Sequence, residues 1–131
     1  GNMSKVQEWI ETHQDEIIRY LQKIIQIPSE TGDEGNIQKF MTQTLTDMGF
    51  DKVDVFEPTI EELSKHPAYV KTNKDYKGRP DVVGTLKGSG KGKSLLFNGH
   101  IDVIPEGAKE NWEHGAWSGD IEDGKMYGRG T

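Results

Sequence analysis

The sequence predicts an α/β protein, on the strength of two segments with helical periodicity and three short apolar segments of strand character. The helical segments fall within residues 4–27 and 37–48, where apolar residues recur every three or four positions. The strand-like segments, residues 53–55, 81–86 and 94–103, are rich in Val, Ile and Leu and are bounded by Gly, Pro or charged turns.

Length and charge narrow the possible functions. The 131 residues fit one domain of the usual size of about 100 to 150 residues. The net charge of −6 disfavours binding to nucleic acid or to an anionic membrane surface. Because the chain contains no cysteine, any metal must be held by His and carboxylate side chains. No apolar run reaches the roughly 20 residues that span a bilayer, so we expect a soluble, cytoplasmic protein.

The first helix is predicted over residues 4–27 as one continuous packing element. Ser4 and Gln7 have the spacing of a capping box, and Pro28 ends the helix. His13 falls in register with the apolar stripe, which favours a packing role for this histidine. The stripe consists of Val6, Ile10, Ile17, Leu21 and Ile24.

The second helix is predicted after the turn residues 29–36 and ends at Gly49. Its stripe consists of Ile37, Phe40, Met41, Leu45 and Met48. Residues 57–80 form a polar connection in which Thr59 and Glu62 can cap a single helical turn. So long a connection is either an insertion or a functional loop, and we favour the insertion.

The strands at 81–86 and 94–103 are predicted to form a hairpin around the glycine-rich segment 88–93. This segment is no phosphate-binding loop, since Lys87 occupies the position where such a loop needs glycine and a strand follows it. The lysine-rich stretch on either side of it indicates a solvated face. A second, smaller hairpin is predicted at the turn Asp123-Gly124.

His100 is the candidate functional histidine, because it follows directly on the apolar run 95–97 and Gly99. In extended geometry His100 and Asp102 project to the same side, where the carboxylate can hold the imidazole of a metal ligand. The pair alone is also compatible with a strand that ends in polar residues. His66 lies in a loop without a supporting neighbour, and His114 is conceivable only as a pocket wall.

A wider pattern surrounds this pair: "NGHIDVIPEG" at 98–107, then Trp112, then "SGDIEDGKMYGRGT" at 118–131. It resembles the N-terminal segment of the di-zinc metallopeptidase family of acetylornithine deacetylase, succinyl-diaminopimelate desuccinylase, aminoacylase and carboxypeptidase G. The resemblance is strong over residues 81–131 and looser over "IPSETGDEGN" at 27–36. Ala116-Trp117 departs from the Pro-Phe that relatives often carry after the Trp.

The resemblance implies a three-layer α/β/α catalytic domain with a mixed sheet. His100 would be the first zinc ligand and Asp102 the catalytic carboxylate that orients it. The remaining ligands and the general base match no motif in residues 1–131, so we expect these residues to be the N-terminal part of the catalytic domain, without the lid and dimerisation domain and inactive by themselves.

The implied activity is hydrolysis of an amide bond in N-acyl amino acids or short peptides, with an acetylornithine deacetylase-like enzyme as the leading expectation. The implied cofactors are two zinc ions, for which cobalt or manganese can substitute, and a homodimer is a possible assembly. The alternative is a non-catalytic binding or interaction module that reuses the fold.

Overall fold

The computed structural model describes residues 4–131 and resolves them into two compact units. One unit combines the N-terminal residues up to Ile27 with Glu106–Thr131, and the other is Pro28–Pro105. Both units contain helix and strand, which confirms the α/β class. Both sheets of the described residues are two-stranded and antiparallel, so the three-layer arrangement with a mixed sheet stays a prediction.

In the first unit the predicted N-terminal helix is divided into α1 (Lys5–Thr12) and α2 (Gln14–Gln26). The capping box is confirmed, with the Gln7 N–H donating to the Ser4 hydroxyl at 3.2 Å. The prediction of one continuous helix through His13 was wrong, because the backbone of His13 leaves the helical region at φ −117° and ψ 22°. The Thr12 hydroxyl donates to the Glu8 carbonyl at 3.0 Å, a side-chain interaction that bends helices.

The apolar stripe of α1 and α2 is largely exposed within the described residues, although we expected a packing face. The one buried residue of these two helices is Ile25, which lies next to the predicted stripe and not in it. The stacking of the His13 ring on Trp9 at 3.9 Å agrees with a packing role for this histidine. No helix of residues 4–131 is both long and apolar enough to cross a membrane.

The small C-terminal hairpin is confirmed. It pairs β3 (Ile121–Glu122) with β4 (Lys125–Met126) in antiparallel register, and a 3₁₀ helix, η1 (Lys109–Asn111), precedes it. Asp123 and Gly124 both have positive φ, 51° and 75°, as a type I′ turn requires. The Asp-Gly signal is therefore sufficient to place this turn.

Side chains of α2 anchor the segment before this hairpin. Gln22 donates to the Gly119 carbonyl at 2.9 Å, and Gln26 donates to the Ser118 carbonyl at 3.0 Å. The unit closes around Ile25 and Ala116, which are 4% and 2% exposed.

His114 belongs to this first unit and has a structural environment. Its ring stacks on Tyr127 at 4.0 Å, and its two nitrogens lie 3.2 Å from Asp120 and 3.1 Å from Glu122. These contacts connect both sides of the hairpin. His114 lines neither of the two hollows described below.

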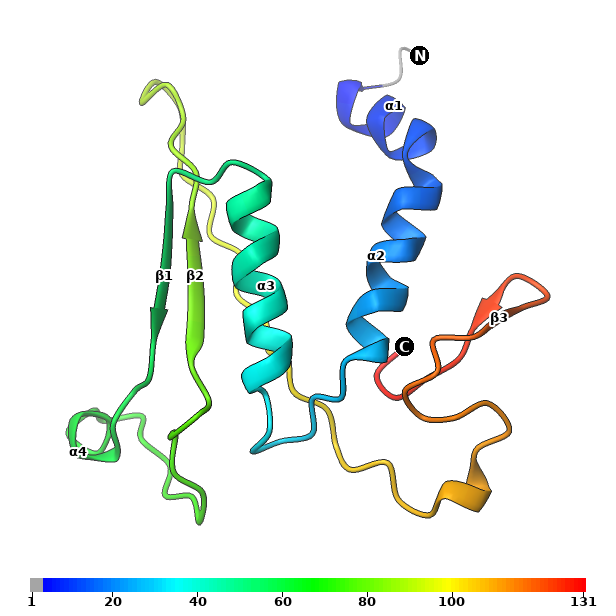
Figure 1. The fold of residues 1–131 in the computed structure, drawn as a ribbon. Coiled ribbons are helices and arrows are strands. Elements are labelled where there is room, and N and C mark those ends of the chain that lie inside the picture. Colours follow the sequence, from blue (N-terminus) through cyan, green and yellow to red (C-terminus); the bar gives the residue numbers. More distant parts are fainter. Residues whose placement is uncertain (1–3) are drawn as a thin grey trace. The chain divides into compact units, whose positions relative to one another are not determined.

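In the second unit, α3 (Gly35–Asp47) packs beside a ribbon of two antiparallel strands, β1 (Lys52–Phe56) and β2 (Asp81–Thr85), as Figure 1 shows. Helix α3 forms where the apolar stripe predicted it, and Ile37 of that stripe is fully buried. Gly84 lets the helix side come close to the ribbon, because a Cβ there would lie 2.8 Å from the Phe50 ring. Helix α3 ends as predicted at Gly49, which has a φ of 82°.

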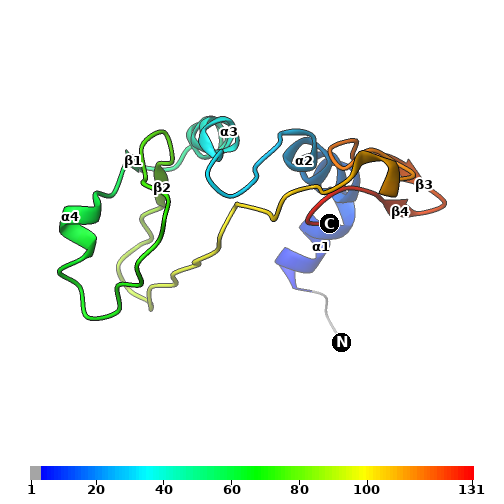
Figure 2. The same cartoon turned by 90° about the horizontal axis from the view of Figure 1, so that it is seen from below.

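The long connection between β1 and β2 contains the predicted single helical turn, α4 (Ile60–Leu63). The Glu62 N–H donates to the Thr59 hydroxyl at 3.2 Å, which confirms the cap. Figure 2 shows α4 on the side of the ribbon away from α3. The rest of the connection returns toward the start of α3, where residues 73–79 meet residues 31–34.

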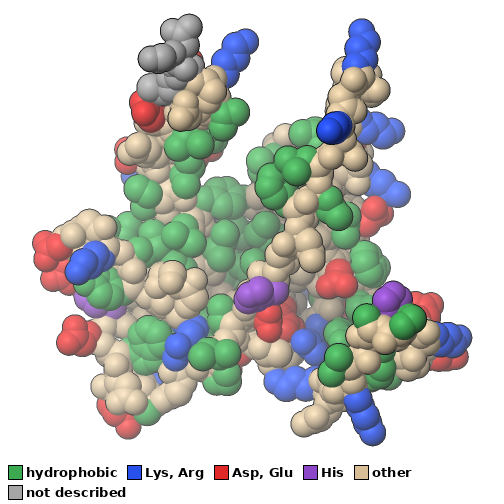
Figure 3. All heavy atoms as spheres, turned by 180° about the vertical axis from the view of Figure 1, so that it is seen from behind, with side chains coloured by type: hydrophobic (Ala, Val, Ile, Leu, Met, Phe, Trp, Pro, Cys, Tyr) green, Lys and Arg blue, Asp and Glu red, His purple; other side chains and the backbone are tan. Residues whose placement is uncertain are grey.

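Residues 94–103 do not form the predicted strand, and the hairpin with β2 is absent from the described residues. Only Val103 pairs, in an isolated parallel bridge with Glu30. The apolar run of Leu95, Leu96 and Phe97 is 78 to 87% exposed, and Figure 3 shows hydrophobic side chains at the surface of this part of the chain. The run has strand propensity, but within residues 4–131 it lacks the hydrogen-bonding neighbour that a strand requires.

We predict that Gly128→Ala destabilises the protein by about 1 to 3 kcal/mol through overpacking. An added Cβ would lie 2.3 Å from Ile25 Cγ2 and 3.1 Å from the Ala116 carbonyl, at the centre of the first unit. Urea denaturation of the full-length protein measures the effect. Gly88→Ala is the matched control, since a Cβ there meets open space and should change stability by less than about 0.5 kcal/mol. Equal stability of both variants would contradict the packing described for Ile25.

Candidate metal-binding site

The candidate site is held by two chain segments of the second unit that run side by side, residues 29–31 and 102–103. The Val103 N–H donates to the Ser29 carbonyl at 2.9 Å, and the Thr31 N–H donates to the Val103 carbonyl at 3.0 Å. These two hydrogen bonds form the parallel bridge between Glu30 and Val103. They bring the turn before α3 next to the His-x-Asp motif, 71 residues away in the sequence.

His100 and Asp102 lie in direct contact. Nδ1 of His100 is 3.0 Å from Oδ1 of Asp102 and 2.9 Å from the Asp102 backbone carbonyl. Both of these oxygens are acceptors, so Nδ1 must carry the proton that it donates. In a neutral imidazole, Nε2 then has the free electron pair that can bind a metal ion.

The carboxylate of Asp102 has a second partner in Thr31, whose hydroxyl donates to Oδ2 at 2.6 Å. This hydrogen bond is the largest influence on the carboxyl group and lowers its pKa. Partial burial acts in the opposite direction, and the hydrogen bond from His100 lowers the pKa further. Asp102 is therefore held as an ionised carboxylate with one oxygen toward each partner.

A buried ion pair between Glu34 and Arg79 closes the turn beside this pair. Nε of Arg79 lies 2.8 Å from Oε2 of Glu34, and Nη2 lies 3.1 Å from Oε1. The Gly32 N–H also donates to Oε1 at 2.9 Å. Glu34 is the N-cap residue directly before α3, but its side chain makes no capping hydrogen bond.

The protonation of this ion pair follows from competition between burial and hydrogen bonding. Burial by itself would raise the pKa of Glu34, but the hydrogen bonds from Arg79 and the Gly32 N–H outweigh it and hold the pKa below its usual value. The Glu34 carboxylate in turn raises the pKa of Arg79, against the effect of burial. Both groups are therefore charged at neutral pH.

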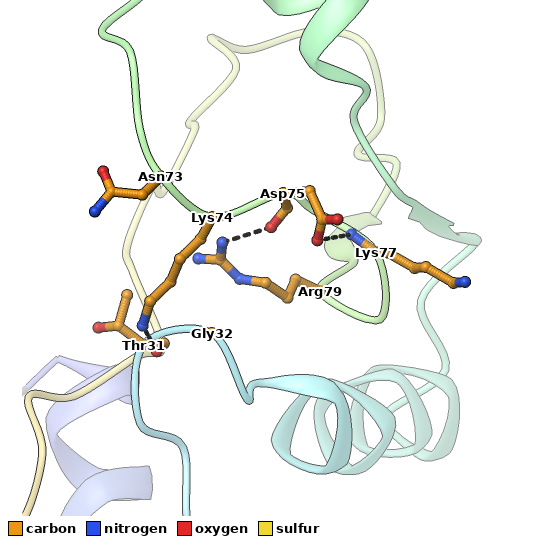
Figure 4. Close-up of a pocket in the computed structure, with 7 residues that line it drawn as sticks. All are labelled: Thr31, Gly32, Asn73, Lys74, Asp75, Lys77 and Arg79. Atoms are coloured by element: carbon orange, nitrogen blue, oxygen red, sulfur yellow. Dashed lines mark hydrogen bonds between the residues drawn. The ribbon is translucent and has the colours of Figure 1, made fainter.

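Two hollows flank the ion pair, both within the second unit. The larger has a volume of about 460 Å³ and lies between residues 31–32 and residues 73–79. Figure 4 shows the Lys74 side chain reaching Thr31, and the Lys74 ammonium donates a hydrogen bond to the Thr31 carbonyl at 2.6 Å. The Lys77 side chain points away from Arg79. The smaller hollow has a volume of about 180 Å³ and is lined by Arg79, Asp81 and Asp102 together with His100.

The structure brings the predicted residues His100 and Asp102 together. His66 is an exposed loop residue of the same unit, and its Nδ1 accepts the Ala68 N–H at 3.0 Å. His13 and His114 belong to the other unit and make the local contacts described above.

Three residues of this arrangement escaped the sequence analysis: Thr31, Glu34 and Arg79. Thr31 and Glu34 were read only as turn residues, and Arg79 as part of a solvated basic stretch. The Arg79 side chain is in fact only 16% exposed, and that of Glu34 only 8%. The pairing spans 45 residues, so no local pattern contains it.

The fit of these residues to a metal ion is partial. Zinc binds about four ligands, with imidazole nitrogen and carboxylate oxygen among the ones it prefers. His100 fits this chemistry because its exposed ring has the tautomer that leaves Nε2 for a metal. Among residues 4–131, however, no three His, Asp or Glu side chains gather so as to hold a metal ion.

Comparison with known proteins gives a family for the same segment. Residues 96–131, which include His100 and Asp102, match the sequence model of peptidase family M20/M25/M40. The chain is 36% identical over 109 residues to a succinyl-diaminopimelate desuccinylase of Methylorubrum populi, covering 82% of this chain and 24% of that relative. It is also 36% identical over 111 residues to the enzyme of the same name from Methylorubrum extorquens, covering 84% and 24%.

Over these residues the chain is similar to the M20/M25/M40 family of peptidases, in agreement with the resemblance of its His-x-Asp and Tyr-Gly-Arg-Gly motifs. It spans about a quarter of the length of the curated relatives that it matches.

We predict that Glu34→Gln destabilises the full-length protein by about 1.5 to 3 kcal/mol at pH 7, because a neutral amide leaves the buried Arg79 without a charged partner. The lowered pKa of Glu34 sets the pH dependence. Its contribution is fully present above the unfolded-state pKa of about 4.3 and is lost as the pH falls through the lower folded-state pKa.

Urea denaturation between pH 7 and pH 3 checks this dependence. The stability difference between wild type and Glu34→Gln should be constant above about pH 5 and shrink below about pH 4. Glu61→Gln, which removes an exposed carboxylate from α4, is the control and should cost little at any pH. A Glu34→Gln effect as small as that of the control would show that the ion pair does not stabilise the turn.

Proposed function

We propose that the full-length protein is a zinc-dependent hydrolase that cleaves the amide bond of N-acyl amino acids or short peptides. The observation that carries the proposal is the hydrogen bond between His100 Nδ1 and Asp102, which fixes the imidazole tautomer and leaves Nε2 for a metal ion. Similarity to the M20/M25/M40 family of peptidases supports the reaction class.

In this proposal His100 is a zinc ligand and Asp102 is the residue that orients it. A carboxylate on the far nitrogen raises the basicity of a ligating imidazole and keeps its ring in place. Zinc, when bound, would polarise the acyl carbonyl and lower the pKa of the attacking water. Cobalt or manganese, which accept similar ligands, are proposed substitutes.

The acyl group of the substrate is still to be assigned by experiment. Acetylornithine was the leading expectation, but the relatives described above are named as succinyl-diaminopimelate desuccinylases. We therefore propose N-succinyl amino acids as the first substrates to test and N-acetylornithine as the second. A cytoplasmic location and a homodimer complete the proposal, which expects no nucleic acid or membrane partner.

We further propose that the 131 residues by themselves bind zinc weakly and do not catalyse. The basis is the number of zinc ligands. A zinc ion needs about four, whereas His100 is the one residue of this chain to which the resemblance gives the role of zinc ligand. Calorimetric titration of zinc into the isolated chain should give no tight binding. Tight binding of two ions would contradict this expectation.

His100→Ala should abolish hydrolysis by the full-length protein and weaken zinc binding at least a hundredfold, because it removes a direct ligand. Asp102→Asn should reduce both by about tenfold to a hundredfold, as is typical for a partner of a ligating histidine. Zinc competition with a chromophoric chelator and steady-state kinetics measure the two effects.

The control for these variants is His66→Ala, which removes an exposed histidine of the same unit. It should leave zinc affinity and turnover unchanged. Wild-type zinc affinity and turnover in His100→Ala would remove His100 from the metal site.

A panel of N-succinyl, N-acetyl and N-formyl amino acids, assayed by release of the free amine, tests the substrate class. The proposal predicts amide hydrolysis that depends on zinc, with kcat/KM highest for one acyl group. Hydrolysis of none of these amides by zinc-loaded, folded protein would contradict the proposed activity.

A further inference from the structure

We propose that Thr31 is a positioning residue of the metal site, whose hydroxyl holds the Asp102 carboxylate in the orientation that serves His100. The proposal rests on the proposed function, because it assigns Thr31 a part in the same site. The three side chains form a linear series, in which Thr31 donates to Oδ2 of Asp102 and Oδ1 of Asp102 accepts from Nδ1 of His100.

The hydroxyl hydrogen of Thr31 has one dominant acceptor. Its oxygen lies 2.6 Å from Asp102 Oδ2 but 3.4 Å from the Val103 carbonyl, the outer limit of a hydrogen bond. A hydroxyl has a single hydrogen to donate, and a carboxylate is the stronger acceptor. The hydrogen bond to Asp102 is therefore the one that Thr31 makes.

The backbone fixes Thr31 beside Asp102 from two directions. Its N–H donates to the Val103 carbonyl at 3.0 Å, and its own carbonyl accepts the Lys74 ammonium at 2.6 Å. The following turn is closed by the Gly32 N–H, which donates to Glu34, and Glu34 is paired with Arg79. The backbone position of Thr31 is thus set by contacts that do not involve the Asp102 side chain.

The side chain of His100 has little packing of its own, and Thr31 is also an exposed residue. The His100 side chain is 85% exposed and that of Asp102 is 32% exposed. Packing therefore does not fix the His100 ring, whose orientation depends on its hydrogen bonds to Asp102, and the Asp102 carboxylate in turn accepts the hydrogen bond from Thr31. Of the three residues in this series, Thr31 is the one whose backbone is held by contacts outside the series. Loss of its hydroxyl should therefore free the Asp102 carboxylate to rotate while leaving the fold intact.

The test compares Thr31→Val, which keeps the shape and removes the hydroxyl, with Thr31→Ser, which restores a hydroxyl. Thr46→Val is the matched control, because Thr46 is an exposed residue of α3 whose hydroxyl donates to the Thr42 carbonyl. Each variant is made in the full-length protein and loaded with zinc or cobalt. Zinc affinity, the visible spectrum of the cobalt form, and kcat and KM are measured.

Thr31→Val should weaken zinc binding about tenfold, alter the cobalt spectrum and lower kcat about tenfold with KM nearly unchanged. Thr31→Ser should recover most of each loss, and Thr46→Val should match wild type. In the Asp102→Asn background, Thr31→Val should have almost no further effect, because Thr31 acts through Asp102. If valine impairs folding, Thr31→Ala replaces it in the same comparison.

The two proposals fail in different ways. If His100→Ala abolishes zinc binding while Thr31→Val and Thr31→Ala match wild type, Thr31 has no positioning role and the proposed function stands. Additive effects of Thr31→Val and Asp102→Asn would also overturn the role of Thr31. If zinc-loaded, folded wild type hydrolyses none of the amides, the proposed function fails; if His100→Ala keeps wild-type zinc affinity and turnover, the role of His100 as a zinc ligand fails, and the inference for Thr31 fails with it.

Discussion

The parallel bridge between Glu30 and Val103 is the contact on which the candidate site depends. Two backbone hydrogen bonds join the turn before α3 to the end of the apolar segment that carries His100 and Asp102. Without them Thr31 would not lie next to Asp102, and the His-x-Asp motif would be an exposed segment without a fixed geometry. The bridge between Glu30 and Val103 therefore places the hydroxyl of Thr31 where it can donate to Asp102.

The ion pair of Glu34 and Arg79 supports this bridge at a cost. Burial of both charges opposes their ionisation. The two hydrogen bonds from the Arg79 guanidinium, together with the one from the Gly32 N–H, offset it at Glu34. Arg79 also lines the smaller hollow next to Asp102 and His100, so the unit has a fixed positive charge near the candidate metal site. The connection 57–80, which we first interpreted as an insertion, thereby contributes a residue to the site.

Sequence signals that act over a few residues predicted the structure well. The capping box at Ser4, the turn at Asp123-Gly124 and the end of α3 at Gly49 all depend on the conformational preferences of the residues themselves. The strand predicted at 94–103 failed because strand formation needs a partner that propensity does not supply. Thr31 was missed for the same reason, since its contact with Asp102 is made across 71 residues.

The central claim is that His100 binds zinc through Nε2 while Nδ1 donates to Asp102. Long-range ¹⁵N–¹H spectroscopy of the histidine-labelled, full-length protein, recorded with and without zinc, tests it most directly. Nδ1 of His100 should stay protonated in both states, and zinc should change the Nε2 resonance much more than that of Nδ1. Loss of the Nδ1 proton on zinc binding, or no zinc-dependent change at His100, would contradict the claim.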